Sequence, residues 1–343
     1  MTQEPLTLKE RLLEIVELFS KARVLVIGDF ILDEYVWGSV SRISPEAPVP
    51  VVNVKRESFL PGGSLNVANN IRTLGGTVFP CGVLGRDLEG RLLVRGMRKL
   101  GIDTGGVVQD RARPTTIKTR VIAHSQQVVR FDREKTEPIS SRDAQRILQF
   151  VRKKIKGVDA VVLEDYGKGV IEPLLLKPLL ELAWRFEKPV LVDPKEKHFS
   201  LYKGVTALTP NRLEATEAFV NFRNGRPPSR GEDLEEIGRG LLKKLHSKAV
   251  LITLGEEGMA LFEKNRPTVR IPTTAREVFD VSGAGDTVIA VFALGIAAGA
   301  SLWEAAVLSN LAAGIVVGKL GTATVEPSEL REAIESQESF IHA

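Results

Sequence analysis

The chain has 343 residues, of which 43% are hydrophobic and 26% are charged, which is ordinary for a globular protein with a large core. Its net charge of +4 is spread along the chain without a dense basic patch, so nucleic acid is not an expected partner. The N-terminal stretch carries acidic residues throughout and has no long apolar core, so we expect no secretory signal and a cytoplasmic protein.

Short apolar runs alternate with helical patterns along most of the chain. An N-terminal surface helix comes first, since Leu8, Leu12, Ile15 and Phe19 recur at helical spacing. Continuous apolar runs predict strands buried on both faces at 23–33, 77–85, 159–165, 188–194, 204–210 and 248–255. Amphipathic patterns that end at glycine lie between several of these runs. The alternation predicts an α/β fold with a mostly parallel sheet covered by helices.

Two other features of the chain have simple interpretations. The single cysteine, Cys81, lies in an apolar strand pattern and excludes an intrachain disulfide, so a buried thiol is expected. The most apolar late stretch, residues 288–308, is interrupted by Gly299, Ser301 and Glu304. It therefore predicts buried core helices and no membrane partner.

Two segments interrupt the alternation. Residues 34–58 are rich in β-branched residues and proline, and residues 114–132 resemble a hairpin that turns near Ser125. Neither segment has a helical pattern. They predict either a small separate β-sheet that forms a lid over the active site, or an ordinary extension of the main sheet's edge.

A run of small residues precedes a carboxylate in the motif DVSGAGDTV. Gly283, Ala284 and Gly285 lead into Asp286 at the expected start of a helix. The first N–H groups of a helix are unpaired and partly positive, and small residues leave them open to an anion. A carboxylate beside a bound phosphate suits a general base that takes a proton from an attacking hydroxyl. A simple helix cap is the alternative interpretation of Asp286.

A second glycine cluster occurs in PGGSLNVA, residues 61–68. Gly62 and Gly63 precede a predicted helix that carries Asn66. The glycines let a ligand approach the backbone, and the Asn66 amide can both donate and accept, which suits a neutral polyol. An ordinary strand-to-helix turn would have the same pattern.

These two clusters resemble the two signatures of the ribokinase-like (PfkB) carbohydrate kinases. The spacing from Gly62-Gly63 through Asn66 to Gly75 and Gly85 is similar to the first signature, and DVSGAGDT follows in the right order. The resemblance extends from about Val24 to Pro327. It implies a ribokinase-like α/β fold with a small β-sheet lid, with ATP and Mg²⁺ as cofactors. Val291 stands where the second signature usually has alanine or glycine, on the helix beyond the site.

The resemblance also implies roles for the matched residues. Asp286 is expected to be the catalytic base, and the amides of Gly283, Ala284, Gly285 and Asp286 to form the anion hole for the transferred phosphoryl group. The sugar is expected to contact Asp33, Gly62, Gly63 and Asn66. The ATP side is expected to comprise Lys195, Asn211, Thr253, Gly255, Gly258 and Asn310.

The metal is expected at the motif TPNRLE, which resembles the family's Asn-x-x-Glu motif. Asn211 and Glu214 would order Mg²⁺ largely through water, since Mg²⁺ keeps much of its hydration shell. A helix N-cap is the alternative role of Asn211, and a solvated surface lysine is the alternative for Lys195.

Within the family, four stretches are similar to the D-glycero-β-D-manno-heptose-7-phosphate kinases: GSVSRISPEAPVPVV, RPTTIKTRV, HSQQVVRFDRE and EDYGKGV. The first three lie in the predicted lid segments and contribute Arg42, Lys118, Arg120 and Arg130. Each would be a solvated charge by itself, but together they suit a sugar phosphate. The resemblance implies ATP-dependent phosphorylation of the C1 hydroxyl of heptose 7-phosphate, for ADP-heptose and lipopolysaccharide core synthesis. Another sugar or nucleoside kinase, or a non-catalytic sugar-binding regulator, remains an alternative.

The expected organisation is a single kinase domain over residues 1–343, with lid segments at about 34–58 and 114–132. Bifunctional members of this group add a nucleotidyltransferase domain with a His-x-Gly-His signature, which this sequence lacks. We therefore expect the kinase part alone. Exposed strands in the lid favour a homodimer.

Overall fold

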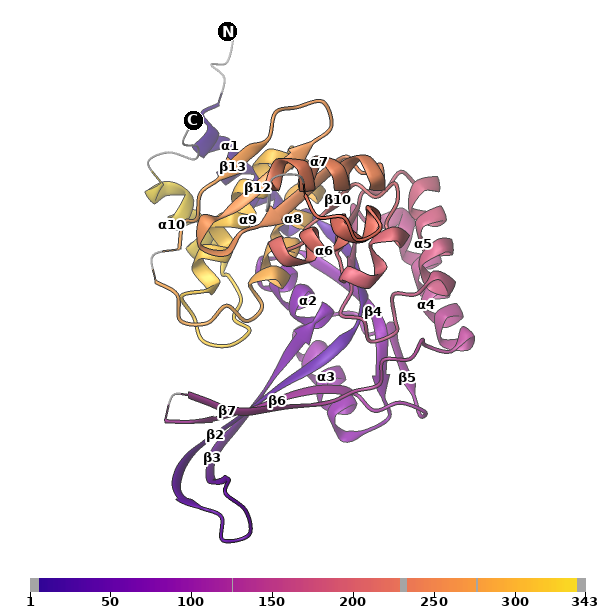
Figure 1. The fold of residues 1–343 in the computed structure, drawn as a ribbon. Coiled ribbons are helices and arrows are strands. Elements are labelled where there is room, and N and C mark those ends of the chain that lie inside the picture. The colour runs from indigo at the N-terminus through magenta and orange to yellow at the C-terminus, as the bar shows by residue number, and fades with distance from the viewer. Residues whose placement is uncertain (1–5, 125, 229–232, 276, 338–343) are drawn as a thin grey trace.

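The structure is a computed structural model that describes residues 6–124, 126–228, 233–275 and 277–337. Within these residues a nine-stranded sheet forms the centre of the body, in the order β13-β12-β11-β10-β9-β8-β1-β4-β5 (Figure 1). Its strands are β1 (Arg23–Gly28), β4 (Thr77–Gly85), β5 (Gly106–Asp110), β8 (Ala160–Glu164), β9 (Val190–Asp193), β10 (Ala207–Leu208), β11 (Ala249–Thr253), β12 (Met259–Glu263) and β13 (Val269–Ile271).

Most of this sheet is parallel. All neighbours from β11 through β10, β9, β8, β1 and β4 to β5 pair in parallel, whereas β12 and β13 add antiparallel strands at one edge. The predicted mostly parallel sheet is therefore confirmed. Because parallel strands run in one direction, their carboxyl ends meet along a common edge, where side chains from distant parts of the sequence come together.

Helices cover both faces of the sheet. One layer comprises α1 (Leu8–Leu18), α2 (Ser64–Thr73), α3 (Leu88–Lys99), α8 (Ala284–Ala297), α9 (Leu302–Val316) and α10 (Pro327–Ser336). The other comprises α4 (Ser141–Lys154), α5 (Pro173–Arg185), α6 (Arg212–Phe222) and α7 (Leu234–Leu245). Short 3₁₀ turns occupy Phe19–Lys21, Ile155–Gly157, Glu196–Leu201 and Gly255–Glu257. Alternate strand residues enter the two cores, as Val24 and Leu25 do in β1.

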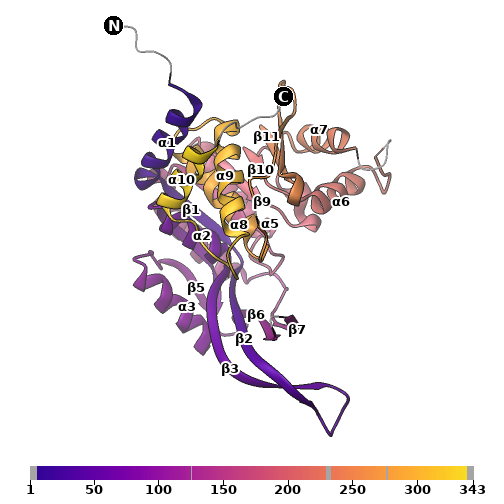
Figure 2. The same ribbon diagram turned by 90° about the vertical axis from the view of Figure 1, so that its left-hand side faces the viewer.

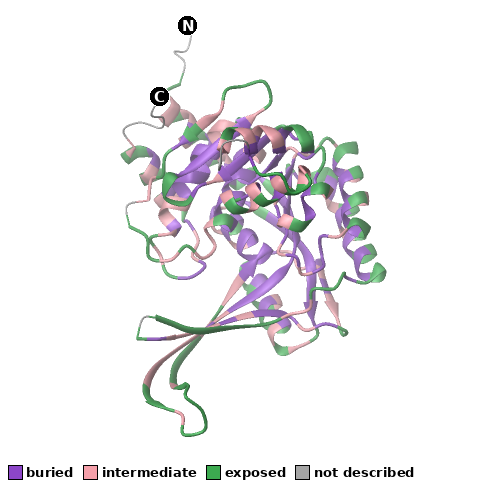
Figure 3. Cartoon of the chain, in the orientation of Figure 1, coloured by how far each residue is buried: buried purple, intermediate pink, exposed green. Residues whose placement is uncertain are grey.

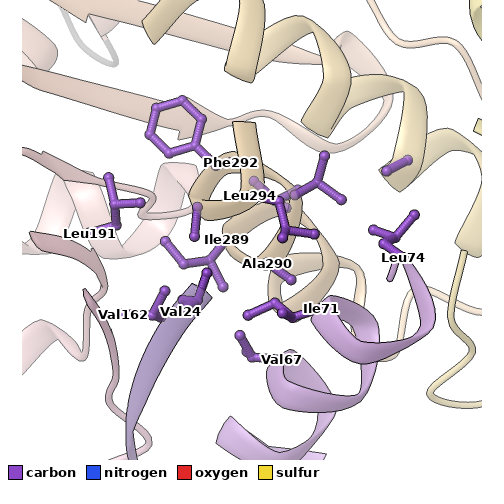
Figure 4. Packing of buried hydrophobic residues seen from close by; sticks show 14 of the residues in the cluster. Val24, Val67, Ile71, Leu74, Val162, Leu191, Ile289, Ala290, Phe292 and Leu294 are labelled. Carbon is purple, nitrogen blue, oxygen red and sulfur yellow. The ribbon is translucent and has the colours of Figure 1, made fainter. Parts of the chain in front are cut away.

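Helix α8 is enclosed on nearly all sides. Every residue from Asp286 to Gly295 is buried. Figure 4 shows Ile289 of this helix near Val24, Val162 and Leu191 of the sheet, and Ala290 beside Ile71 of α2. This packing holds the N-terminus of α8 in a fixed place at the carboxyl edge of the sheet.

A separate four-stranded sheet, the lid, projects from the body (Figures 1 and 2). Its strands are β2 (Phe30–Ile43), β3 (Pro50–Gly63), β6 (Thr116–Ala123) and β7 (Gln126–Arg133), in the order β3-β2-β6-β7. The strands of this sheet cover most of the predicted segments 34–58 and 114–132. The first hairpin is longer in sequence than predicted, because it runs from residue 30 to 63. The alternative of an edge extension is wrong. Ser125, where the second hairpin was expected to turn, lies outside the described residues.

One predicted strand is wrong. The apolar run 23–33 is divided at Asp29, because β1 ends at Gly28 in the central sheet and β2 begins at Phe30 in the lid. The Asp29 side chain accepts backbone hydrogen bonds from Tyr166, Lys168 and Val170 at 3.0–3.1 Å. These bonds hold Asp29 at the point where the chain leaves the central sheet.

Two smaller expectations concern Cys81 and the apolar helices. Cys81 lies in β4 and is fully buried, as predicted, and burial raises the pKa of its thiol. Among the described residues, none of the helices combines the length and apolar character needed to cross a bilayer.

Candidate active site

Three carboxylates meet where β8, β9 and α8 end or begin. Glu164 is the last residue of β8, Asp193 is the last of β9, and Asp286 lies in the first turn of α8. One oxygen from each lies within 4.8 Å of the others. Glu164 and Asp286 are almost completely inaccessible, at 0% and 2% exposure. Burying like charges so close together costs free energy, which indicates that the cluster has a chemical role.

Asp286 is held by a donor on each carboxylate oxygen. The Asn66 amide donates to Oδ2 and the Tyr166 hydroxyl donates to Oδ1, each at 2.7 Å. Burial raises the pKa of Asp286 to about 6, although both hydrogen bonds favour the ionised form. A buried carboxylate with a pKa near 6 is ionised at neutral pH and basic enough to accept a proton from a hydroxyl.

The start of α8 depends on Gly283. This residue has φ of 79°, and a Cβ there would lie 2.6 Å from the Asn66 amide nitrogen that holds Asp286. The N–H of Ala284 already donates to the carbonyl of Val281 at 3.2 Å. No backbone carbonyl of the described chain accepts from the N–H groups of Gly285 and Asp286. The Gly283 N–H likewise has no backbone acceptor in the described chain, so Gly283, Gly285 and Asp286 supply the available donors of the predicted anion hole.

The expected sugar side forms around Asp33 in β2. Asp33 is 4% exposed and forms an ion pair with Arg120 of β6, whose guanidinium also lies over the Tyr35 ring. A Cβ at Gly62 would lie 2.0 Å from an Asp33 carboxylate oxygen, so glycine there leaves room for that side chain. The structure thus brings Asp33, Gly62 and Asn66 together, with Arg120 already paired.

A group of cations lies on the lid side of Asp286. The Lys118 ammonium lies 4.5 Å from the centre of the Tyr166 ring, and burial lowers its pKa, as do nearby Arg130 and Lys168. Arg130 contacts Asp132 through two nitrogens at 2.9 and 2.7 Å. The Lys168 ammonium pairs with Glu134 at 2.6 Å. Lys118 and Arg130 of the lid and Lys168 of the adjoining loop after β8 lie near one another and are called the lid cation group below.

Two adjoining cavities lie on the other side of Asp286. A polar cavity of about 210 Å³ is lined by Asp193, Lys195, Asn211, Glu214 and Asp286, among others. An apolar cavity of about 480 Å³ has Gly255, Gly258 and Asn310 among its lining residues, and Thr253 and Gly285 line both. An apolar cavity that opens into a polar one suits a nucleotide base and its phosphates.

The structure places Asn211 and Glu214 in a reciprocal helix cap. The Asn211 side chain accepts from the N–H of Glu214 at 2.9 Å, and Glu214 accepts from the N–H of Asn211 at 3.1 Å. Lys195 pairs with Glu196 at 2.6 Å and lies 4.0 Å from Glu214. The Asn310 amide donates to the carbonyl of Pro272 at 2.7 Å. The helix-cap alternative for Asn211 is therefore realised, although the residue still lines the polar cavity.

Sequence reasoning missed several members of this site: Asp29, Glu164, Tyr166, Lys168 and Asp193. The available signal was positional, because Glu164 and Asp193 each end an apolar run that predicts a buried strand. A carboxylate at the carboxyl end of a parallel strand lies at the edge where ligands bind. Tyr166 and Lys168 lie in EDYGKGV, a stretch identified by resemblance but given no role.

The fold, a mostly parallel sheet with a separate lid, and a buried carboxylate beside a nucleotide-sized cavity define a carbohydrate kinase that uses ATP. Residues 21–329 match the model of the pfkB family carbohydrate kinases. The chain belongs to this family.

Similar proteins and structures agree with this assignment. The chain is 47% identical over 322 residues to the bifunctional protein HldE of Desulfatibacillum aliphaticivorans, covering 94% of this chain and 65% of that protein. It is 48% identical over 315 residues to the bifunctional protein HldE of Trichlorobacter lovleyi, covering 92% and 63%. The chain therefore spans just under two thirds of the length of these relatives.

Solved structures share the fold at low sequence identity. Arabidopsis thaliana ribokinase complexed with ribose and ATP aligns with a TM-score of 0.70 at 20% identity, covering 92% of this chain and 99% of that one. Escherichia coli phosphofructokinase-2 in complex with potassium aligns with a TM-score of 0.75 at 18% identity, covering 92% and 98%. The predicted ribokinase-like fold with its small lid sheet is confirmed.

Proposed function

We propose that this protein transfers the γ-phosphoryl group of ATP to the C1 hydroxyl of D-glycero-β-D-manno-heptose 7-phosphate. The product would be the 1,7-bisphosphate, an intermediate on the way to ADP-heptose. The observation that carries the proposal is Asp286, a buried carboxylate with two donors, between the polar sugar side and the nucleotide cavities. The identity to the bifunctional HldE proteins supports the heptose substrate.

In this proposal each group of residues has a separate role in binding or catalysis. Asp286 takes the proton of the attacking hydroxyl, and the free N–H groups of Gly285 and Asp286 stabilise the charge on the transferred group. Asp33 and Asn66 bind sugar hydroxyls. The adenine enters the apolar cavity beside Asn310, and the phosphates enter the polar one near Lys195 and Thr253.

The carboxylate cluster fits a divalent cation. Neither carboxylate oxygen of buried Glu164 receives a hydrogen bond from a donor in the described chain, and burial raises the pKa of both Glu164 and Asp193 well above their usual ranges. Mg²⁺ prefers oxygen ligands of this kind. Glu164 and Asp193 would hold Mg²⁺, with Glu214, which lines the same polar cavity as Asp193, close by. The metal would neutralise charge on the ATP phosphates. Asn211 is occupied as a cap and is a weaker candidate.

The lid cation group supports a substrate with a second anionic end. If C1 lies at Asp286, the opposite end of a heptose is directed toward the lid. Lys118, Arg130 and Lys168 supply positive charge there, and charge-assisted hydrogen bonds to phosphate are strong. Arg120 would act indirectly, since it is engaged with Asp33.

A substrate panel tests the proposal. ADP release would be measured for heptose 7-phosphate, unphosphorylated heptose, ribose, fructose and adenosine. We expect heptose 7-phosphate to have by far the highest kcat/KM. Equal turnover of ribose, fructose or adenosine would refute the heptose assignment and favour another sugar or nucleoside kinase. Binding without any turnover would favour the sugar-binding regulator.

Two expectations about the protein in the cell belong to the same proposal. Exposed apolar side chains on the lid, including Val54, Val129 and Phe131, support a homodimer formed through this sheet. The use of ATP supports a cytoplasmic location. Light scattering of the purified protein tests the dimer, since a monomeric mass would contradict it.

A further inference from the structure

The loop that follows β8, residues 165–170, is unusually well anchored. Asp29, itself buried, accepts hydrogen bonds from three of its backbone N–H groups, those of Tyr166, Lys168 and Val170. Asp165, in the loop, is also buried and accepts hydrogen bonds from Gly167, His198 and Tyr202. A loop held by two buried carboxylates is a rigid support for any side chain that it carries.

Tyr166 projects from this loop between two functional parts of the molecule. Its hydroxyl donates to Asp286 Oδ1 at 2.7 Å. Its ring face lies under the Lys118 ammonium, 4.5 Å from the ring centre. One side chain of the body therefore touches both the expected base and the lid strand β6.

We propose that Tyr166 is a positioning residue with two separable roles: its hydroxyl orients Asp286, and its ring places Lys118 for the anionic end of the substrate. The inference rests on the proposed function for the roles of Asp286 and Lys118. Tyr166 would thereby connect the base Asp286 in the body with Lys118, which contacts the substrate from the lid.

The hydroxyl role follows from the geometry around Asp286. Asn66 donates to one carboxylate oxygen and Tyr166 to the other, which fixes the plane of the carboxylate. Each oxygen still has a free lone pair for the substrate hydroxyl. Hydrogen bonds to a carboxylate favour its ionised, proton-accepting form. Without the Tyr166 hydroxyl, Asp286 would be buried with one oxygen unsatisfied and free to rotate.

The ring role follows from the crowding of like charges. Lys118 is near Arg130 and Lys168, and its burial disfavours the charged form. An aromatic face attracts an ammonium ion and offsets part of this penalty. Removing the ring would let Lys118 leave the position from which it faces the substrate.

Two substitutions at Tyr166 separate the roles. Tyr166→Phe keeps the ring and removes the hydroxyl, so kcat should fall roughly ten- to a hundredfold, while KM and the preference for the phosphorylated sugar stay unchanged. Tyr166→Leu removes both, so it should also reduce, by roughly tenfold, the ratio of kcat/KM for phosphorylated over unphosphorylated sugar. An unchanged kcat in the first variant overturns the hydroxyl role. If the two variants have the same ratio of kcat/KM for phosphorylated over unphosphorylated sugar, the ring role is overturned.

A matched control and a double mutant exclude a merely structural effect. Thr115 has another buried hydroxyl that donates to a carboxylate, that of Asp87 at 2.6 Å, away from the reacting groups and from loop 165–170. Thr115→Val should lower the unfolding temperature without changing kcat. In an Asp286→Asn background, Tyr166→Phe should have little further effect on kcat, because its route of action is gone. A further fall of ten- to a hundredfold would overturn positioning through Asp286.

These experiments also distinguish this inference from the proposed function. If the wild-type protein prefers a sugar other than heptose 7-phosphate, the heptose assignment fails, and the kcat effect of Tyr166→Phe is measured with that sugar. Thermal-shift titration with inorganic phosphate provides a readout without turnover. Tyr166→Leu should weaken the shift and Tyr166→Phe should preserve it. Equal shifts in the two variants count against the ring role.

Discussion

The body and the lid are built from different kinds of strand. In the body, β8 is buried at every position and β1 at every position after its first. In the lid, β7 is exposed at every position, and the outer half of β3 is largely exposed, as Figure 3 shows. The clustered carboxylates Glu164, Asp193 and Asp286 come from ends of body elements, whereas Asp33 and most cations come from lid strands. In the proposed function, the buried body elements would hold the reacting groups in place, and the more exposed lid would select the substrate.

Substitution of Asp286 gives the sharpest test of the body's chemical role. Asp286→Asn should lower kcat by roughly 10²- to 10⁴-fold, the usual contribution of a positioned base, with ATP and sugar affinity largely retained. Steady-state kinetics and calorimetric binding measure both. Asp103→Asn, at a partly exposed carboxylate paired with Lys154, is the control. Near-normal turnover of the Asp286 variant would remove this residue from the role of base.

A matched pair of valines tests the difference in packing. Val162 in β8 is fully buried, and Val129 in β7 is 47% exposed. Val162→Ala should lower the free energy of unfolding by about 2 kcal/mol, because it removes buried methyl groups and leaves a cavity. Val129→Ala should change it by less than about 0.5 kcal/mol. Chemical denaturation measures both, and equal losses would contradict the distinction between body and lid in the monomer.

Two lid cations test selection by the lid. Lys118→Ala should lower kcat/KM for heptose 7-phosphate by roughly ten- to a hundredfold and affect unphosphorylated heptose much less. Arg130→Ala should have a smaller effect in the same direction, because Arg130 is partly exposed and already paired with Asp132. Equal losses of kcat/KM with both sugars would show that these lid cations do not recognise the phosphate of the substrate.

The Mg²⁺ dependence of the rate tests whether the carboxylates at the carboxyl edge of the central sheet bind the metal. Glu214→Gln should raise the Mg²⁺ concentration for half-maximal rate by roughly tenfold, a typical effect for a group close to a metal. Glutamine can still complete the reciprocal cap with Asn211, so the helix start is preserved. An unchanged Mg²⁺ titration would leave Glu214 with only its capping role.

The smallest expected effect concerns pH and the buried pair behind the site. The hydrogen bond that the His198 ring donates to the Asp165 carboxylate raises the pKa of His198 above its usual value. The charged pair therefore stabilises the folded state below the unfolded pKa of about 6.5, and this contribution is lost as pH rises through the higher native pKa. The stability difference between wild type and His198→Gln should shrink as the pH rises from below about 6.5 through the raised native pKa of His198. A difference that grows with pH would contradict this sign.

Local patterns were enough to predict the main sheet, most of its strands and the lid segments. They failed at the edge strands β5 and β13, which each contain only two apolar residues, and at β12, which lies between β13 and β11. They also failed at Asp29, where the apolar run continues but the chain changes sheet. Apolar character reports burial, and it cannot report which sheet receives a strand, because that depends on hydrogen bonds from the distant loop 165–170.

The sequence by itself determined the family, through its two glycine signatures, and the identity of Asp286 as the candidate base, through small residues before a helix. Only the tertiary structure decided what surrounds that base. Glu164 and Tyr166 reach it from the end of β8, Asp193 reaches it from the end of β9, and Lys118 reaches Tyr166 from the lid. All of these residues are far from Asp286 in the chain and share no local motif with it. Their proximity arises because parallel strands end at one edge of the sheet, which no local pattern records.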